Sequence, residues 1–238
     1  MKKINRLIFT AKKRMKYSTD PAHDLGHVKR VVNNVKNLSR ELNLTEKQKQ
    51  AIILAAWWHD VSRTTTKRPS FIIMPFIDDL LSALLLWRET IRCKFFGNVA
   101  GMSTRIIFCK SMGTGKLLTK ILLTKKSRVL LHVLQDADTL DLLNTKRMEQ
   151  IMHITEHGSK LYHYGYKTMI WWFLQGKQLY MKTKEARKYV AKLINEFLNW
   201  IKQKYIYNWH IKQFGKKWFD KNIVQAEKLI LKLQKISK

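Results

Sequence analysis

The chain has 238 residues and a formal net charge of +29, because 46 Lys and Arg face only 17 Asp and Glu. A hydrophobic fraction of 45% excludes a chain that is disordered by composition, and the length allows one large domain or a domain with an extension. With only 9 Gly and 3 Pro, the chain lacks the turn residues that many short strands would need, which favours an all-α fold.

Periodic apolar residues predict helices in chain order. A short basic helix is expected over residues 1–17, and a cap signal at Asp20 opens a second helix that runs to about residue 42. Thr45 and Gln48 form a capping box for a third helix, which is apolar nearly all round and therefore buried. Further helices are expected near residues 74–92, 98–112, 146–157, 186–201 and 223–233.

Three features of composition bear on location and partners. Cys93 and Cys109 give no disulfide framework, so we expect a reducing cytoplasm. The most apolar stretch, residues 71–87, carries Asp78 and Asp79 in its middle, which predicts a buried helix and no membrane span. The positive charge indicates either a polyanionic partner (nucleic acid, anionic lipid or phosphorylated substrates) or lysines spread over solvated faces, and lysines in every segment leave both interpretations open. Of the partners, a membrane surface is the least expected, because the C-terminal helices show no interfacial face distinct from a packing face.

Four residues in three predicted helices form a candidate metal site: His27, the pair His59 and Asp60, and Asp138. Two imidazoles and two carboxylates suit a divalent metal ion, and four such ligands leave room for water, as in a catalytic site. The expected ion is Mn, Fe, Co, Ni, Zn or Mg, since the ligand types do not select one.

The residues around these four strengthen the prediction. Residues 22–31 read AHDLGHVKRV, residues 55–63 read AAWWHDVSR, and residues 135–141 read QDADTLD. In order, spacing and flanking residues this pattern resembles the HD superfamily of metal-dependent phosphohydrolases, over roughly the first two thirds of the chain. The resemblance implies an HD-domain-like helical bundle whose metal ion is held by the four residues. It also implies hydrolysis of a phosphoester, in a nucleotide or another small phosphorylated substrate, by metal-activated water.

Four further residues are candidates for catalytic roles. His23, one turn before His27, is expected to bind phosphate or a second metal, and Asp24 to orient a ligand histidine or to serve the helix N-terminus. Arg63 is expected to clamp a substrate phosphate or to form a surface ion pair. Lys110 lies where many HD proteins place an additional His, which favours one metal ion over two and provides a charge that neutralises phosphate.

The domain prediction is a catalytic domain over residues 1–180 and a basic, amphipathic helical extension over residues 181–238, packed on the core. Residues 64–70 follow the predicted ligands directly and are expected to form a rim or a lid of the site. Sequence alone assigns neither the substrate nor an oligomeric state.

A second functional hypothesis is nucleic-acid binding with a degenerate HD site. Residues 202–210 interleave lysines with aromatic residues, a pattern that can follow a phosphate backbone and stack bases. The remaining aromatic and histidine pairs are expected to be structural. We expect Trp57–Trp58 and Trp171–Trp172 to lie in the core, and His153 and His157 to be a solvated pair on one helix.

Overall fold

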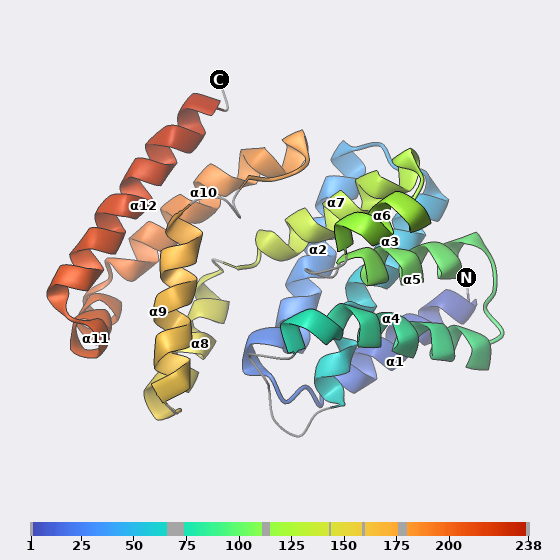
Figure 1. Cartoon of the computed structure of the whole chain (residues 1–238), viewed down its shortest axis with the longest axis horizontal. Helices are drawn as coiled ribbons and strands as arrows, with labels where there is room; N and C mark the ends of the chain where they lie inside the picture. The colour runs from blue at the N-terminus through green and yellow to red at the C-terminus, as the bar shows by residue number, and fades with distance from the viewer. Residues whose placement is uncertain are drawn as a thin grey trace. The chain divides into compact units, whose positions relative to one another are not determined.

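The computed structural model describes residues 2–65, 74–110, 115–142, 144–158, 160–175 and 180–236. Within these ranges the chain forms helices and no strand, which confirms the predicted all-α class (Figure 1). None of the described helices is long and apolar enough to cross a membrane. The chain divides into two compact units, Met1–Asp138 and Thr139–Lys238, which we call unit 1 and unit 2.

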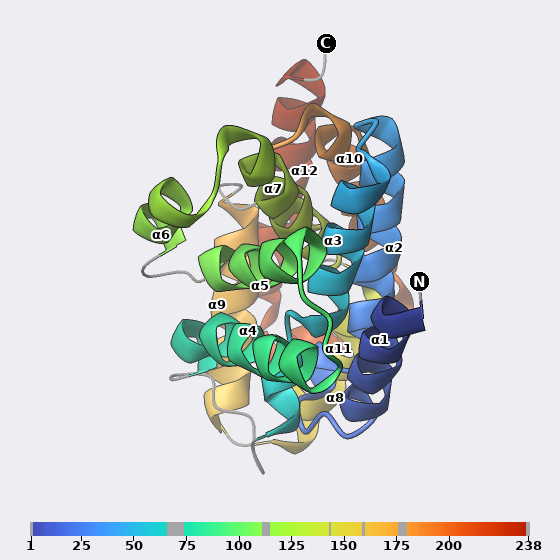
Figure 2. The same cartoon turned by 90° about the vertical axis from the view of Figure 1, so that its right-hand side faces the viewer.

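Unit 1 is built around a central buried helix. Helix α3 packs between α2 and α5, with α1 also against it, and α4 lies beside α5 in both views (Figures 1 and 2). The predicted helices are present, whereas α6 falls on a segment for which no helix was predicted. The elements are α1 (Lys2–Met15), a 3-10 turn (Pro21–His23), α2 (Leu25–Glu41), α3 (Glu46–Trp58), a 3-10 turn (Val61–Thr64), α4 (Met74–Arg92), α5 (Asn98–Lys110), α6 (Gly115–Leu122) and α7 (Lys125–Thr139).

Helix α3 begins and ends where the sequence indicates. The backbone N–H of Gln48 donates to Oγ1 of Thr45 at 3.4 Å, and the backbone N–H of Thr45 donates to Oε1 of Gln48 at 2.9 Å, which confirms the capping box. Its second half is buried on nearly all sides, as expected for a helix without a polar face. The helix ends at Trp58, so His59 and Asp60 lie at the end of a core helix.

The second predicted helix begins later than the sequence indicates. The side chain of Asp20 accepts a hydrogen bond from the N–H of Ala22 and caps only the short 3-10 turn Pro21–His23. Asp24 then adopts an extended conformation and caps α2, with Oδ1 accepting from the backbone N–H of His27 at 2.7 Å. Two successive aspartate caps therefore set where α2 starts and where His27 lies on it.

The prediction that residues 71–87 form a buried helix is wrong for one face of α4. Residues 71–73 lie outside the described part, and from Ile77 onward the helix buries one face that holds several acidic and hydroxyl residues together with Leu86, and exposes a second face of large apolar residues. The buried side chains on this helix include Asp78, Asp79, Ser82, Glu89 and Thr90, and the exposed ones include Ile77, Leu80, Leu84, Trp87 and Ile91.

Unit 2 begins before the boundary predicted between residues 180 and 181. Helices α8 and α9 pack against each other, α8 also packs against α10, and α9 against α12, so these segments form one compact unit. The predicted functional division of the chain stays a prediction. The elements are α8 (Thr145–His157), α9 (Lys160–Leu174), which the sequence analysis did not predict, α10 (Lys184–Ile201), α11 (Lys204–Phe214) and α12 (Lys216–Ile236).

An aromatic cluster lies at the centre of unit 2. The hydroxyl of Tyr166 donates to Nε2 of His210 at 2.7 Å, and Nδ1–H of His210 donates to the carbonyl of Ile206 at 2.7 Å. The rings of Tyr166 and Phe214 stack with their centroids 5.4 Å apart. Trp209 is buried against this cluster. The aromatic residues of α11 thus contribute mainly to the core of unit 2.

The two tryptophan pairs differ in their environment. Trp57 and Trp58 are buried, as predicted. Trp171 and Trp172 on α9 are 56% and 47% exposed, so the prediction that they lie in the core is wrong. Helix α9 already buries its opposite side through residues such as Tyr166, which leaves two adjacent indoles facing away from the core.

Candidate metal centre

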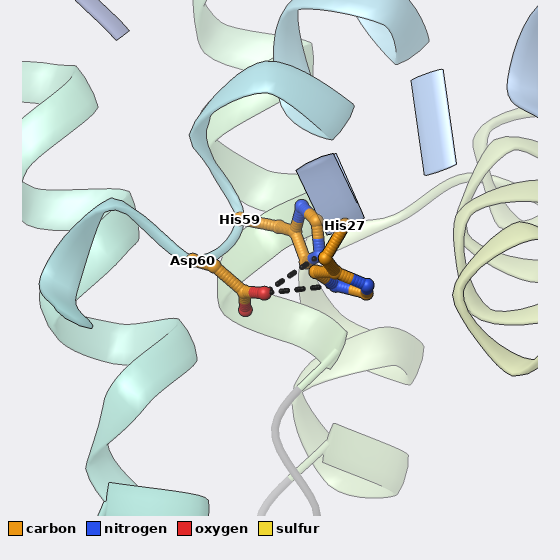
Figure 3. Close-up of side chains that lie close together, drawn as sticks. All are labelled: His27, His59 and Asp60. Carbon is orange, nitrogen blue, oxygen red and sulfur yellow. Dashed lines mark ion pairs between the residues drawn. The ribbon is translucent and has the colours of Figure 1, made fainter. Parts of the chain in front are cut away.

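Three of the four predicted ligands converge at one buried point in unit 1. Nε2 of His27, from α2, lies 3.1 Å from Oδ2 of Asp60, and Nε2 of His59 lies 3.2 Å from the same oxygen (Figure 3). All three side chains are buried. The four-residue pattern read from the sequence therefore brings together groups from separate helices.

Local contacts at the helix ends orient His59 through its ring and place His27 through its backbone. Nδ1–H of His59 donates to the carbonyl of Ala56 at 2.8 Å, which leaves Nε2 as the atom that faces Asp60. Asp24 caps α2 through the N–H of His27 and so fixes that residue's backbone. Asp24 thus serves the helix N-terminus, the alternative role considered from the sequence, and in doing so positions a predicted ligand.

The donor atoms have the spacing of ligands around one ion. Adjacent ligands that each lie about 2.1 Å from a divalent ion are about 3 Å apart. The three donor atoms of His27, His59 and Asp60 lie within 4.8 Å of one another. Nε2 of His59 and Oδ2 of Asp60 are both buried. Among the described residues, neither atom forms a contact whose angles satisfy a hydrogen bond. The residues present therefore fit a divalent cation.

The electrostatics of the cluster also favour a positive charge. Burial lowers the pKa of His59, but the adjacent carboxylate of Asp60 outweighs it and raises the pKa to about 9. Burial raises the pKa of Asp60, but the imidazoles around it hold that pKa well below its usual range. The buried carboxylate therefore remains ionised and attracts a cation or a proton.

Asp138, the fourth predicted ligand, lies at the edge of this cluster. Its Oδ1 is 3.4 Å from Nε2 of His27, and its Oδ2 is 3.0 Å from Nζ of Lys110. Burial raises the pKa of Asp138, but the Lys110 ammonium and the imidazoles outweigh it and hold the pKa below its usual range. Only one of its two oxygens faces the histidines.

Lys110 forms ion pairs with two carboxylates. Besides Asp138, its Nζ lies 3.4 Å from Oδ1 of Asp79 on α4. Burial lowers the pKa of Lys110, but Asp138, Asp79 and Asp60 raise it well above its usual value. The ammonium therefore stays protonated and cannot ligate a metal ion.

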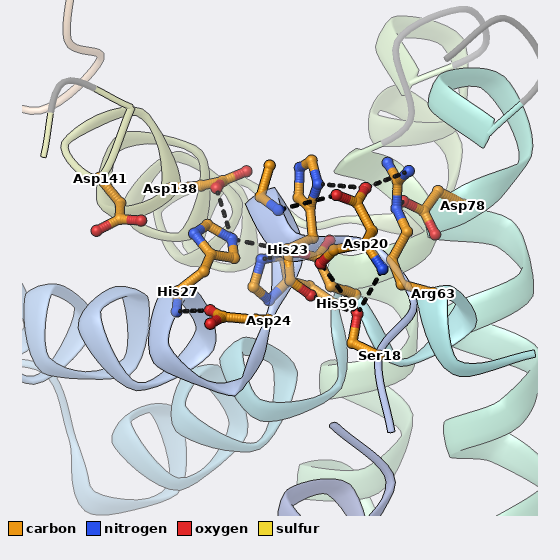
Figure 4. A network of polar contacts seen from close by, with 12 residues as sticks. Ser18, Asp20, His23, Asp24, His27, His59, Arg63, Asp78, Asp138 and Asp141 are labelled. Carbon is orange, nitrogen blue, oxygen red and sulfur yellow. Dashed lines mark hydrogen bonds and ion pairs between the residues drawn. The ribbon is translucent and has the colours of Figure 1, made fainter. Parts of the chain in front are cut away.

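Arg63 and His23 meet at the carboxylate of Asp20, which the sequence pattern indicates only as a helix cap. Oδ2 of Asp20 lies 2.8 Å from Nδ1 of His23 and 3.1 Å from Nη1 of Arg63, and Nε of Arg63 pairs with Asp78 (Figure 4). Arg63 is only 7% exposed, so the surface ion pair considered from the sequence is wrong. Its guanidinium is held between two carboxylates.

The site thus contains three acidic residues that sequence reasoning missed as site residues: Asp20, Asp78 and Asp79. The signal for two of them was present, because acids in the middle of a strongly apolar stretch need buried cations as partners. Burial and the Asp60 carboxylate raise the pKa of Asp78 to about 7, although Arg63 opposes this. Of the predicted rim segment, residues 66–70 lie outside the described residues.

Comparison of the chain with protein-family models, with curated proteins and with solved structures found no match.

Proposed function

We propose that this protein is a metal-dependent phosphohydrolase of the HD type, which hydrolyses a phosphoester in a nucleotide or another small phosphorylated compound. The observation that carries the proposal is the convergence of two imidazoles and a carboxylate, from His27, His59 and Asp60, at the spacing of ligands around one ion. The order and flanking residues of the motifs support the same family, which the comparisons neither support nor oppose.

The residues of the chain have distinct roles in this proposal. His27, His59, Asp60 and the near oxygen of Asp138 would hold the ion. A bound divalent ion supplies a more acidic water molecule and neutralises charge on the phosphoryl oxygens. Because protonated Lys110 engages the other oxygen of Asp138, the donor set supports one ion rather than two.

His23 and Arg63 take positions that refine their predicted roles. The side chain of His23 is 26% exposed. Its Nδ1–H donates a hydrogen bond to Asp20, which orients the imidazole beside the predicted ligand His27. It is therefore the best-placed group for contact with substrate. The guanidinium of Arg63 forms ion pairs with Asp20 and Asp78. Its proposed role is therefore to hold those two side chains in place.

The test compares Asp60→Ala with Asp220→Ala, an exposed carboxylate of α12 that pairs with Lys216. Purified proteins are analysed for metal content and for phosphate release from nucleotides and nitrophenyl phosphates with added Mn²⁺, Co²⁺, Ni²⁺, Zn²⁺ or Mg²⁺. We expect Asp60→Ala to lose bound metal and at least about 10³-fold of its turnover, and Asp220→Ala to keep both. Turnover unchanged by Asp60→Ala would reject the proposed site.

Nucleic-acid binding gains no support from the site. Trp209 and His210, which contributed to the stacking hypothesis, are buried in unit 2. The exposed aromatic residue in that segment is Tyr205, at 72%. The hypothesis therefore depends chiefly on the net charge and stays a prediction.

A further inference from the structure

Helix α4 carries an exposed apolar stripe along its outward face, the α4 stripe. Five large side chains recur at alternating intervals of three and four residues, which places them on one side of a helix. Their exposed fractions range from 39% to 54%, and in Figure 2 the helix lies on the near side of unit 1 beside α5. The stripe consists of Ile77, Leu80, Leu84, Trp87 and Ile91.

The inward face of α4 explains why the helix does not bury this stripe. Asp78 is paired with Arg63, and Asp79 with Lys110, so the acidic side of the helix is held toward the candidate metal centre. A helix has one rotational setting about its axis, and the ion pairs that point the acids inward point the large apolar residues outward. The exposure is thus a consequence of the polar site.

The outward face combines apolar and positively charged residues. The three carboxylates on described residues of α4 (Asp78, Asp79 and Glu89) are all buried, whereas Arg88 and Arg92 are exposed. An apolar strip that includes tryptophan, bordered by arginines, has the composition of helices that lie in a membrane interface. Contiguous exposed apolar surface of this kind marks an interaction site.

We propose that the outward face of α4 docks on the surface of an anionic lipid bilayer, with the α4 stripe entering the headgroup region. This inference is independent of the proposed catalytic function. The net charge of +29 attracts the chain to anionic lipid, and Arg88 places positive charge beside the stripe, whereas the charge of Arg92 is paired with Glu89. A second copy of the chain would bring together two bodies of the same high charge, which opposes self-association through this face.

The experiment measures co-sedimentation of the full chain with phosphatidylcholine vesicles, with and without phosphatidylglycerol. We expect binding to the anionic vesicles at 0.1 M salt, weak binding to the neutral ones, and a fall in affinity of about tenfold or more in Leu84→Gln/Trp87→Gln. The matched control is Trp171→Gln/Leu231→Gln, which changes one exposed tryptophan and one exposed leucine of unit 2 and should bind as the wild type does.

Three outcomes would overturn the proposal. Absence of binding to anionic vesicles would reject the lipid surface, and equal binding by both double variants would mean that charge alone drives it. A concentration-dependent dimer in light scattering, abolished by Leu84→Gln/Trp87→Gln, would assign the stripe to a second copy instead. Hydrogen exchange of the wild type gives a readout that needs no variant, because amides of α4 should gain protection when anionic vesicles are added.

Discussion

Unit 1 and unit 2 each bury a histidine completely, but the two side chains have different neighbours. His59 in unit 1 faces the carboxylate of Asp60, and its pKa is raised to about 9 despite the opposing effect of burial. His210 in unit 2 contacts the hydroxyl of Tyr166 and the carbonyl of Ile206, and burial lowers its pKa to about 4.

This contrast separates a polar site from a structural core. Around His59 the chain has gathered carboxylates and cations that are expensive to bury, and such arrangements are typical of functional sites. The described groups that contact His210 are neutral, since its hydrogen bonds go to a phenol hydroxyl and a backbone carbonyl and its ring packs on aromatic rings. The two units should therefore respond differently to the loss of a charge, to acid and to the loss of one hydroxyl.

The largest stability effect is expected from Arg63→Met. The change leaves the buried carboxylates of Asp20 and Asp78 without their shared cation, which should cost about 3–5 kcal/mol of unfolding free energy in unit 1. Lys49→Met is the matched control, because Lys49 pairs with Glu46, whose side chain is 79% exposed, so the expected cost is about 0–1 kcal/mol. Urea unfolding at pH 7 measures both. Equal costs would show that the buried pairs do not hold unit 1 together.

Acid should weaken unit 2 through His210. The folded pKa of about 4 lies below the unfolded value of 6.5, so the unfolded chain binds more protons in this window and stability falls as pH drops from 6.5 toward 4. At pH 4.5 the loss should be about 2–3 kcal/mol relative to pH 7.

Hydrogen exchange of α9 and α11 measures this effect, with His210→Gln as the variant that lacks the titrating group. The opening free energy of α9 and α11 in the wild type, relative to that in His210→Gln, should fall by about 2–3 kcal/mol between pH 7 and pH 4.5. His153→Gln, at an exposed position of α8, should follow the wild type. A gap between wild type and His210→Gln that does not change with pH would contradict the assigned cause.

The smallest effect is expected from Tyr166→Phe. Loss of the hydroxyl leaves Nε2 of His210 buried without its donor, which should cost about 1–2 kcal/mol in unit 2. Tyr164→Phe on the same helix is the control, since Tyr164 is 65% exposed and should change stability little. Thermal unfolding compares the two variants, and an equal shift for both would remove the buried hydrogen bond as the source of the difference.

Sequence alone predicted much of the secondary structure, because helix periodicity and caps are local properties. The helices predicted near residues 74–92, 98–112 and 146–157 are present over the described residues, with 111–112 outside them, and the capping box of Thr45 and Gln48 is present. Residue chemistry also selected His27, His59 and Asp60, which converge in the structure. The helices and their caps are determined by residue type and spacing over one or two turns, whereas the convergence of the three site residues is not, because it joins separate helices.

Only the tertiary structure decided which groups meet and which faces are covered. Asp20 and Asp79 could not be matched to Arg63 and Lys110 in advance, because such pairs join segments that are distant in the chain. The same ion pairs decide how α4 is rotated about its axis. Apolar residues occur on more than one side of this helix, so the apolar pattern alone does not select the buried side. A pattern of apolar residues fixes that a helix forms, but its rotation about its own axis depends on where its few buried charges find their partners.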